Sequence, residues 1–173
     1  YHAKRGYALE MQAKKKLIKY DEAKAPYEKC IEADENYADC YHQLGNVMLW
    51  MDDEQKALEN YTKAIEHDPS QLRYYGPLAE LYINLNYMKE AEEVLKEAQT
   101  RAAPNDKGLW LIHTMMSDVL VSKGDLNGAV RELEAAKAIN TGEGPEQIYT
   151  LYNLGALYAR LNPPRKQDAT DML

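Results

Sequence analysis

An internal repeat of about 34 residues is the feature that most restricts how this chain of 173 residues can fold. Four alanines end similar acidic or polar phrases, and Ala23, Ala57, Ala91 and Ala129 are spaced by 34, 34 and 38 residues; Ala169 follows after 40. A large apolar residue follows each alanine by four positions, and in the first four rows a small residue stands three positions later. This spacing places all three on one face of a helix. The sequence therefore predicts a stack of similar helical units.

A second set of columns keeps the same phase. A large residue stands beside a small one thirteen and twelve positions before Ala57, at Leu44 and Gly45, and the same arrangement recurs at Leu78 and Ala79 before the next alanine. A large residue beside a very small one lets a second helix approach closely. Further pairs are Met116 with Ser117 and Leu154 with Gly155. No stretch shows the alternation of a half-buried strand, so we expect an all-α fold.

Helix starts are marked by acidic residues. Asp52 followed by Gln55 predicts a capping box before the Ala57 helix. Gly124 and Asp125 predict a break and a new cap before the Ala129 helix. The sequence thus predicts helices joined by short turns.

The second row resembles the consensus of the tetratricopeptide repeat family. It carries Tyr41, Leu44, Gly45, Met48, Ala57, Tyr61, Ala64 and Pro69. The resemblance implies a right-handed superhelical solenoid of about five antiparallel helix pairs. The expected repeats are residues 4–37, 38–71, 72–105, 110–143 and 148–173, the last incomplete. The longer spacings predict extra loop residues at 102–108, 141–145 and 162–165, which are candidate contact sites.

The same resemblance implies that the first helix of each pair lines a concave groove that holds a protein or peptide partner. The expected groove residues are Arg5, Gln12, Lys16, His42, Asn46, Trp50, Arg73, Glu80, Asn84, Thr114, Asp118, Ser122, Tyr149, Tyr152 and Asn153. Asn46 and Asn153 are the preferred candidates because an amide can both donate to and accept from a peptide backbone. Tyr149 and Tyr152 offer rigid contact area with a hydroxyl group.

One ligand class is disfavoured. Members of the family that grip the carboxylate tail of cytosolic heat-shock chaperones resemble one another in a pattern of Lys, Asn and Arg on three successive groove helices. This chain offers His42 with Asn46, then Pro77, then Leu111 with Met115, and only Asn46 fits that pattern.

Composition and motifs exclude several other functions. Hydrophobic residues make up 45% and charged residues 28%, as in folded chains. A formal net charge of −7 argues against nucleic acid as a partner. The four histidines form no i, i+4 pair, so we expect no metal site, no cofactor and no catalytic cluster. No apolar run is long enough for membrane insertion.

Two readings are open for the two cysteines. Cys30 and Cys40 flank a predicted turn between antiparallel helices, so they face each other as a disulfide or lie buried as two small thiols. A bridge favours an oxidising compartment such as the bacterial periplasm over the cytoplasm.

We therefore expect a non-enzymatic scaffold for protein–protein interaction within a multiprotein assembly. Bacterial proteins of the family that this chain resembles often serve envelope, pilus, secretion or motility machinery. The alternatives are a structural module that self-associates through an open C-terminal helix, or a docking appendage of an enzyme outside this sequence.

Overall fold

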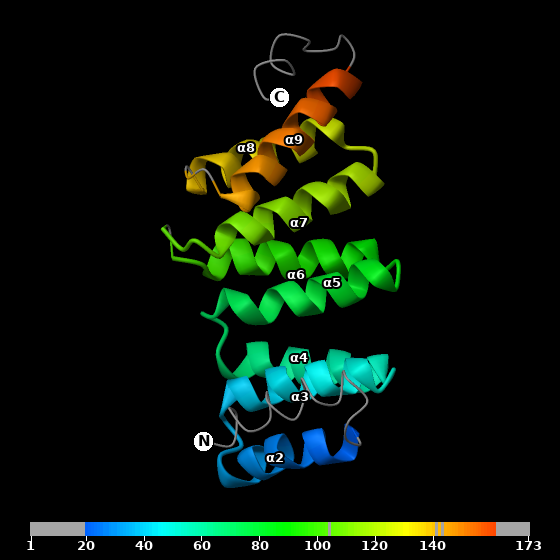
Figure 1. The fold of residues 1–173 in the computed structure, drawn as a ribbon, viewed down its shortest axis with the longest axis vertical. Helices are drawn as coiled ribbons and strands as arrows, with labels where there is room; N and C mark the ends of the chain where they lie inside the picture. The colour runs from blue at the N-terminus through cyan, green and yellow to red at the C-terminus, as the bar shows by residue number, and fades with distance from the viewer. Residues whose placement is uncertain (1–19, 104, 141, 143, 162–173) are drawn as a thin grey trace. The chain divides into compact units, whose positions relative to one another are not determined.

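The computed structural model describes residues 20–103, 105–140, 142 and 144–161, and these residues form helices and turns without a strand. The helices are α2 (Tyr20–Ala33), α3 (Ala38–Trp50), α4 (Glu54–His67), the short 3-10 helix η1 (Leu72–Tyr74), α5 (Tyr75–Asn84), α6 (Met88–Arg101), α7 (Leu109–Ser122), α8 (Leu126–Ile139) and α9 (Pro145–Arg160). The all-α prediction is confirmed in the described part of the chain (Figure 1).

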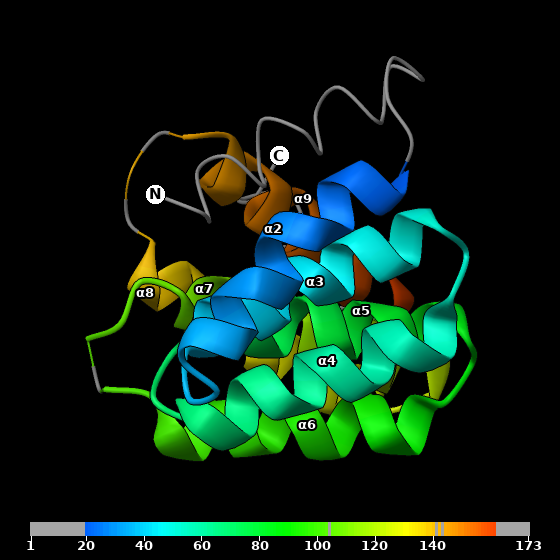
Figure 2. The ribbon, with the colours of Figure 1, turned by 90° about the horizontal axis from the view of Figure 1, so that it is seen from below.

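The chain divides into two compact units, residues 1–81 and 82–173. In the first unit, α3 packs against both α2 and α4, and the three helices lie side by side (Figure 2). In the second unit, α8 packs against α7 and α9, and α7 also packs against α6. Each unit is thus built from helices that bury one face against their neighbours in sequence.

The repeated alanines lie in equivalent, fully buried positions. Ala23, Ala57, Ala91 and Ala129 belong to α2, α4, α6 and α8, and each is 0% exposed. The large residues four positions later are also buried: Tyr27, Tyr61, Leu95 and Leu133. Burying such a side chain contributes roughly 1.5–3 kcal/mol, so these columns supply much of the core.

The large-and-small pairs form the other half of the core. Leu44 and Gly45 are buried in α3, as are Met116 and Ser117 in α7. A methyl group added at Gly45 would lie 2.7 Å from ring atoms of Tyr61 on α4. The crossing of α3 and α4 therefore depends on the absence of a side chain at this position.

The cap of α4 differs from the sequence prediction. Asp53, not Asp52, is its N-cap, and the Asp53 carboxylate accepts a hydrogen bond from the amide of Lys56 at 3.1 Å. Asp52 has a φ of 57° and belongs to the preceding turn, while the side chain of Gln55 donates to Glu59 instead of closing a capping box. The turn needed one left-handed residue before the helix began, which the motif alone did not reveal.

The predicted break before α8 is confirmed. Gly124 has a φ of 83°, and Asp125 caps the helix by accepting from the amide of Gly128 at 2.8 Å.

A polar cluster also ties three helices of the second unit together. Glu132 on α8 lies 2.7 Å from the Nδ1 atom of His113 on α7 and accepts a hydrogen bond from Gln99 on α6 at 2.8 Å. Since all three side chains are partly buried, these contacts help to fix the helix order.

Candidate partner-binding surface

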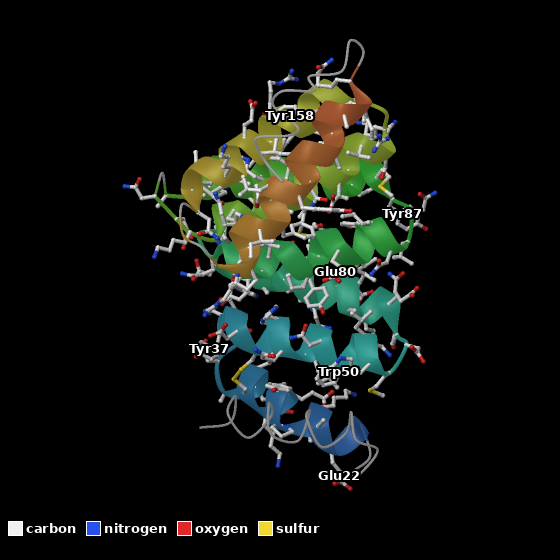
Figure 3. All side chains as sticks on the ribbon, turned by 45° about the horizontal axis from the view of Figure 1, so that its top comes forward. Glu22, Tyr37, Trp50, Glu80, Tyr87 and Tyr158 are labelled. Atoms are coloured by element: carbon white, nitrogen blue, oxygen red, sulfur yellow. A yellow bond between two sulfur atoms is a disulfide. The ribbon has the colours of Figure 1, made fainter. Side chains whose placement is uncertain are left out.

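In the first unit, the expected groove residues on α3 are engaged in contacts within the protein. The Oδ1 atom of Asn46 accepts a hydrogen bond from the Tyr61 hydroxyl at 2.8 Å, and its Nδ2 atom donates to Gln43 at 3.1 Å. Trp50 is half-buried at the end of α3 (Figure 3). The amide of Asn46 thus positions a core tyrosine and is not a free peptide-binding group.

His42 is held between two aromatic rings. Its ring centroid lies 6.0 Å from that of Tyr61 and 5.4 Å from that of Tyr74. Both imidazole nitrogens are buried and have no hydrogen-bond partner among the residues that the structure describes. Burial lowers the pKa of His42; the Asp39 carboxylate opposes this shift, and the Arg73 cation adds to it. The imidazole is therefore a packing group that resists protonation.

Arg73 belongs to a small polar cluster where η1 meets α3. Its guanidinium lies 3.0 Å from the Asp39 carboxylate and donates to the Tyr74 hydroxyl at 3.1 Å. The Tyr74 hydroxyl in turn donates to Asp39 at 2.9 Å. Burial raises the pKa of Tyr74 to about 12, its hydrogen bond to Asp39 adds to the rise, and Arg73 opposes it. The charge of Arg73 is exposed but already paired, and such pairs contribute little to stability.

On α5, the expected residues Glu80 and Asn84 are exposed, and Glu80 is marked in Figure 3. Arg5, Gln12 and Lys16 lie outside the described residues.

In the second unit, the outward faces of α7 and α9 carry exposed apolar side chains. Leu111 is 45% exposed on α7, while Tyr149 and Tyr152 are 46% and 63% exposed on α9, next to Ile148 at 65%. A hydrogen bond of 2.8 Å from the Trp110 indole to the Thr150 hydroxyl links the two helices. We call Leu111, Ile148, Tyr149 and Tyr152 the α7–α9 surface.

Thr114 is a correction to the predicted groove. It is 4% exposed, and its hydroxyl donates to the carbonyl of Trp110 at 2.8 Å on its own helix. The outward stripe of α7 instead passes through Leu111, Met115, Asp118 and Ser122, which recur at helical spacing and are exposed or half-buried. Sequence reasoning had placed Leu111 and Met115 on a groove helix but had not chosen them as contacts.

Two polar side chains on these helices have unused hydrogen-bonding capacity. The Asp118 carboxylate makes no ion pair among the described residues, and the surrounding protein raises its pKa by desolvation. The Nδ2 atom of Asn153 on α9 is buried and makes no hydrogen bond within the described part of the chain. Both belong to the expected groove set, but only the Asp118 side chain is exposed to a ligand.

The two cysteines form a disulfide between α2 and α3. The Cα atoms of Cys30 and Cys40 are 6.2 Å apart, and the bridge is visible as a yellow bond in Figure 3. Of the two readings left open by the sequence, the structure therefore has the bridged one. Cys40 is fully buried, and Cys30 occupies the column that holds Ala64, Ala98 and Ala136 in the later rows.

A cleft of about 600 Å³ opens where α7 begins, α8 ends and α9 begins. Its walls are formed by Lys107, Gly108, Trp110, Leu111, Ile139, Asn140, Gly142 and Glu146. These residues include parts of the two connections that the longer repeat spacing had marked as candidate contact sites. The spacing indicated the place, whereas the cleft itself depends on how three helix ends meet.

Within the described ranges, no group of three or more His, Cys, Asp or Glu side chains could hold a metal ion. A helix long and apolar enough to cross a membrane is also absent from that part of the chain.

The relatives of this chain point to one family. The profile described as "Tetratricopeptide repeat protein 21 ARM repeat" matches residues 15–142, which is more than half of the chain. Among curated proteins, Hsp70-Hsp90 organizing protein 3 of Arabidopsis thaliana is 28% identical over 101 residues, covering 57% of this chain and 18% of that protein. The chain therefore spans less than a fifth of the length of this relative.

Solved structures with low sequence identity share the fold. The chain is similar to PilF of Pseudomonas aeruginosa, with a TM-score of 0.81, 18% identity and coverage of 99% of this chain and 71% of that one. It is also similar to YrrB, described as a TPR protein with an unusual peptide-binding site, with a TM-score of 0.67, 21% identity and coverage of 99% and 84%. For MamA the TM-score is 0.71, the identity 18% and the coverage 94% and 88%. From the matched profile, the shared fold and the buried alanine columns, the chain belongs to the tetratricopeptide repeat family.

Proposed function

We propose that this chain is a non-catalytic scaffold that holds a segment of a partner protein against the α7–α9 surface. The observation that carries the proposal is the exposure of Leu111, Tyr149 and Tyr152 on helices whose other faces are buried. Exposed apolar side chains gathered on one face mark interaction sites more often than scattered ones do. The family and fold are those of protein-interaction scaffolds, which are typically without catalytic activity.

The side chains of this surface suit a peptide or a helix. Tyrosine offers large contact area at a small loss of conformational entropy, and tyrosines are enriched among residues that dominate binding energy. The carboxylate of Asp118, which makes no ion pair among the described residues, supplies a polar contact on α7. A segment that combines apolar side chains with polar groups would complement them.

The carboxylate tail of a chaperone is not the ligand we propose. The curated relative is named as an organizing protein of Hsp70 and Hsp90. In this chain, however, only Asn46 fits the clamp pattern, and its oxygen accepts from Tyr61. Lacking the lysine and arginine of that pattern, the chain would bind a tail carboxylate poorly.

For the compartment, we propose an oxidising environment such as the bacterial periplasm. The support is the bridge between Cys30 and Cys40, because structural disulfides persist mainly outside reducing cytosol. A role in a bacterial envelope assembly such as a pilus or secretion machine fits this environment.

The test begins with a partner recovered from the native host and then purified. Titration calorimetry should show that the variant Tyr149→Ala with Tyr152→Ala binds this partner at least about tenfold more weakly, because two contact tyrosines are truncated. The matched control is Tyr87→Ala, which removes a tyrosine that is 51% exposed at the turn between α5 and α6 (Figure 3). Equal affinity of the double variant and the wild type would remove the α7–α9 surface from consideration.

Self-association is the second candidate, and the same exposure favours it. Ile148 and Tyr152 project from α9 and could meet a second copy. Sedimentation equilibrium over a wide concentration range distinguishes the two functions: a monomer at every concentration would refute self-association and leave the partner-binding proposal intact.

A further inference from the structure

We propose that the cleft between the ends of α7, α8 and α9 is a second docking site. It would take a short extended segment of a partner that places one large aliphatic side chain inside, an acidic residue toward α7 and a basic residue toward α9. This inference rests on the proposed function and adds to it a site at the edge of the helix pairs, with a ligand of defined chemistry.

The inner wall of the cleft is apolar and fixed. Trp110 and Leu111 from α7 and Ile139 from α8 line it. The Trp110 indole donates to the Thr150 hydroxyl at 2.8 Å, and that hydroxyl donates to the carbonyl of Glu146 at 2.9 Å. Because these bonds hold the aromatic ring between α7 and α9, the wall is ready before a ligand arrives, which lowers the entropy cost of binding.

The size of the cleft suits several residues of a peptide. Pockets that enclose organic ligands usually measure about 300–1,000 Å³, and this cleft, at about 600 Å³, falls within that range. A single ion would leave most of it empty. An aliphatic side chain would instead cover the faces of Trp110, Leu111 and Ile139.

The rim determines the charges of the occupant. Lys107 stands before the start of α7, and Glu146 lies in the first turn of α9. Neither charge has an ion-pair partner among the residues that the structure describes, and they are not paired with each other. Asn140, also on the rim, offers an amide that can meet a peptide backbone. An acidic and a basic residue on either side of the aliphatic anchor would complement this rim.

The molecule carries its own reporters for a test. Its two tryptophans are Trp50 on α3 and Trp110 in the cleft. With 5-fluorotryptophan incorporated, each gives one fluorine resonance, and the variant Trp110→Phe assigns them. The probe is a short capped peptide of the sequence Ser-Asp-Gly-Leu-Gly-Arg-Ser. Three control peptides replace Leu by Ala, Asp by Asn or Arg by Gln.

We expect the probe to shift the Trp110 resonance saturably and to leave the Trp50 resonance in place. The peptide with Ala for Leu should bind about tenfold more weakly because the apolar contact is lost. Each neutralised charge should weaken binding about two- to fivefold, as for ion pairs at a surface. The variant Lys107→Gln should bind the probe and the control with Asn for Asp equally, because the lysine that meets the acidic residue is gone. The variant Glu146→Gln should likewise bind the probe and the control with Gln for Arg equally.

Other outcomes would overturn the inference. These are a Trp110 resonance that does not move, binding that is indifferent to the leucine, or charge preferences that persist in both rim variants. Binding of the native partner to two double variants distinguishes this inference from the proposed function. If Tyr149→Ala with Tyr152→Ala weakens that partner and Lys107→Gln with Glu146→Gln does not, the cleft is refuted and the α7–α9 surface stands; if neither pair has an effect, both proposals fail.

Discussion

The substitution Gly45→Ala tests how closely the helices of the first unit cross. The new methyl carbon would lie 2.7 Å from the Cδ1 and Cε1 atoms of Tyr61, whereas ordinary carbon contacts are about 3.5–4.0 Å. The Tyr61 ring cannot swing aside easily, because it is 1% exposed and its hydroxyl is bonded to Asn46 at 2.8 Å. The helices or the ring must therefore shift.

Two opposing effects decide the sign of the change in stability. Replacing glycine by alanine inside a helix favours folding by up to about 1 kcal/mol. Overpacking a filled core costs about 1–3 kcal/mol, and here the neighbour is a ring buried between helices. Because the added methyl would lie 2.7 Å from that ring, we expect an overpacking cost of about 2–3 kcal/mol and hence a net loss of about 1–2 kcal/mol. This loss corresponds to a fall in Tm of roughly 2–8 °C for a chain of this size.

The control and the rescue use other positions of the same chain. Gly142→Ala should leave Tm almost unchanged, because an added methyl would lie at an ordinary contact distance of 3.6 Å from the Asn140 side chain. In the pairing of α7 with α8, Ser117 stands in the column of Gly45 and Leu133 in the column of Tyr61. Where the first position carries a side chain larger than glycine, the second therefore carries one smaller than tyrosine. Gly45→Ala combined with Tyr61→Leu should thus be more stable than the sum of the single changes predicts, by about 1 kcal/mol in urea unfolding. A Gly45→Ala protein as stable as wild type, or more so, would refute the reasoning.

Three further predictions concern the bridge, a helix cap and a buried imidazole. Cys30→Ala should lower the unfolding free energy by about 3 kcal/mol, because a bridge spanning ten residues restricts the unfolded chain; a reductant should lower the Tm of wild type to about that of the variant and leave the Tm of the variant unchanged. Asp53→Ala should cost about 1 kcal/mol in thermal unfolding because the cap of α4 is lost, whereas Gln55→Ala should cost little, the reverse of what a capping box beginning at Asp52 would give. The lowered pKa of His42 means that the unfolded chain binds more protons, so the unfolding free energy should fall as the pH drops below about 6.5, and His42→Phe should reduce that slope; an identical pH profile for the two proteins would count against burial of the imidazole.

The core could be predicted from the sequence because it repeats. Ala57 and Ala129 occupy the same column and are both fully buried, since each packs a second helix against a first one at close range. Once the buried positions of one repeat are known, the same positions are expected to be buried in every other repeat. The turn before the second helix repeats as well: Asp52, Asn86 and Gly124 all have a positive φ, and the next residue is the N-cap each time. The capping-box motif counted from Asp52 took no account of this column.

The candidate surface was harder to predict. Thr114 holds a column that should face the groove, yet its hydroxyl is satisfied by its own helix and the side chain is buried. The sequence presented Asn46 as a free amide, and only the structure reveals that its Oδ1 atom accepts a hydrogen bond from the Tyr61 hydroxyl. The remaining groove residues and the repeat boundaries stay predictions. The cleft beside Trp110 arises from three helix ends and has no sequence motif.

The covalent link between α2 and α3 changes how that part of the molecule can open. In arrays of helix pairs each element is held mainly by its neighbours, so separation can spread from one pair to the next. When α2 loses its packing, Cys30 stays tethered to Cys40, and the helix re-forms its contacts as an intramolecular event. Amide protons of α2 should consequently exchange more slowly than its packing alone would allow, and treatment with a reductant should raise their exchange rate to the one that packing alone allows.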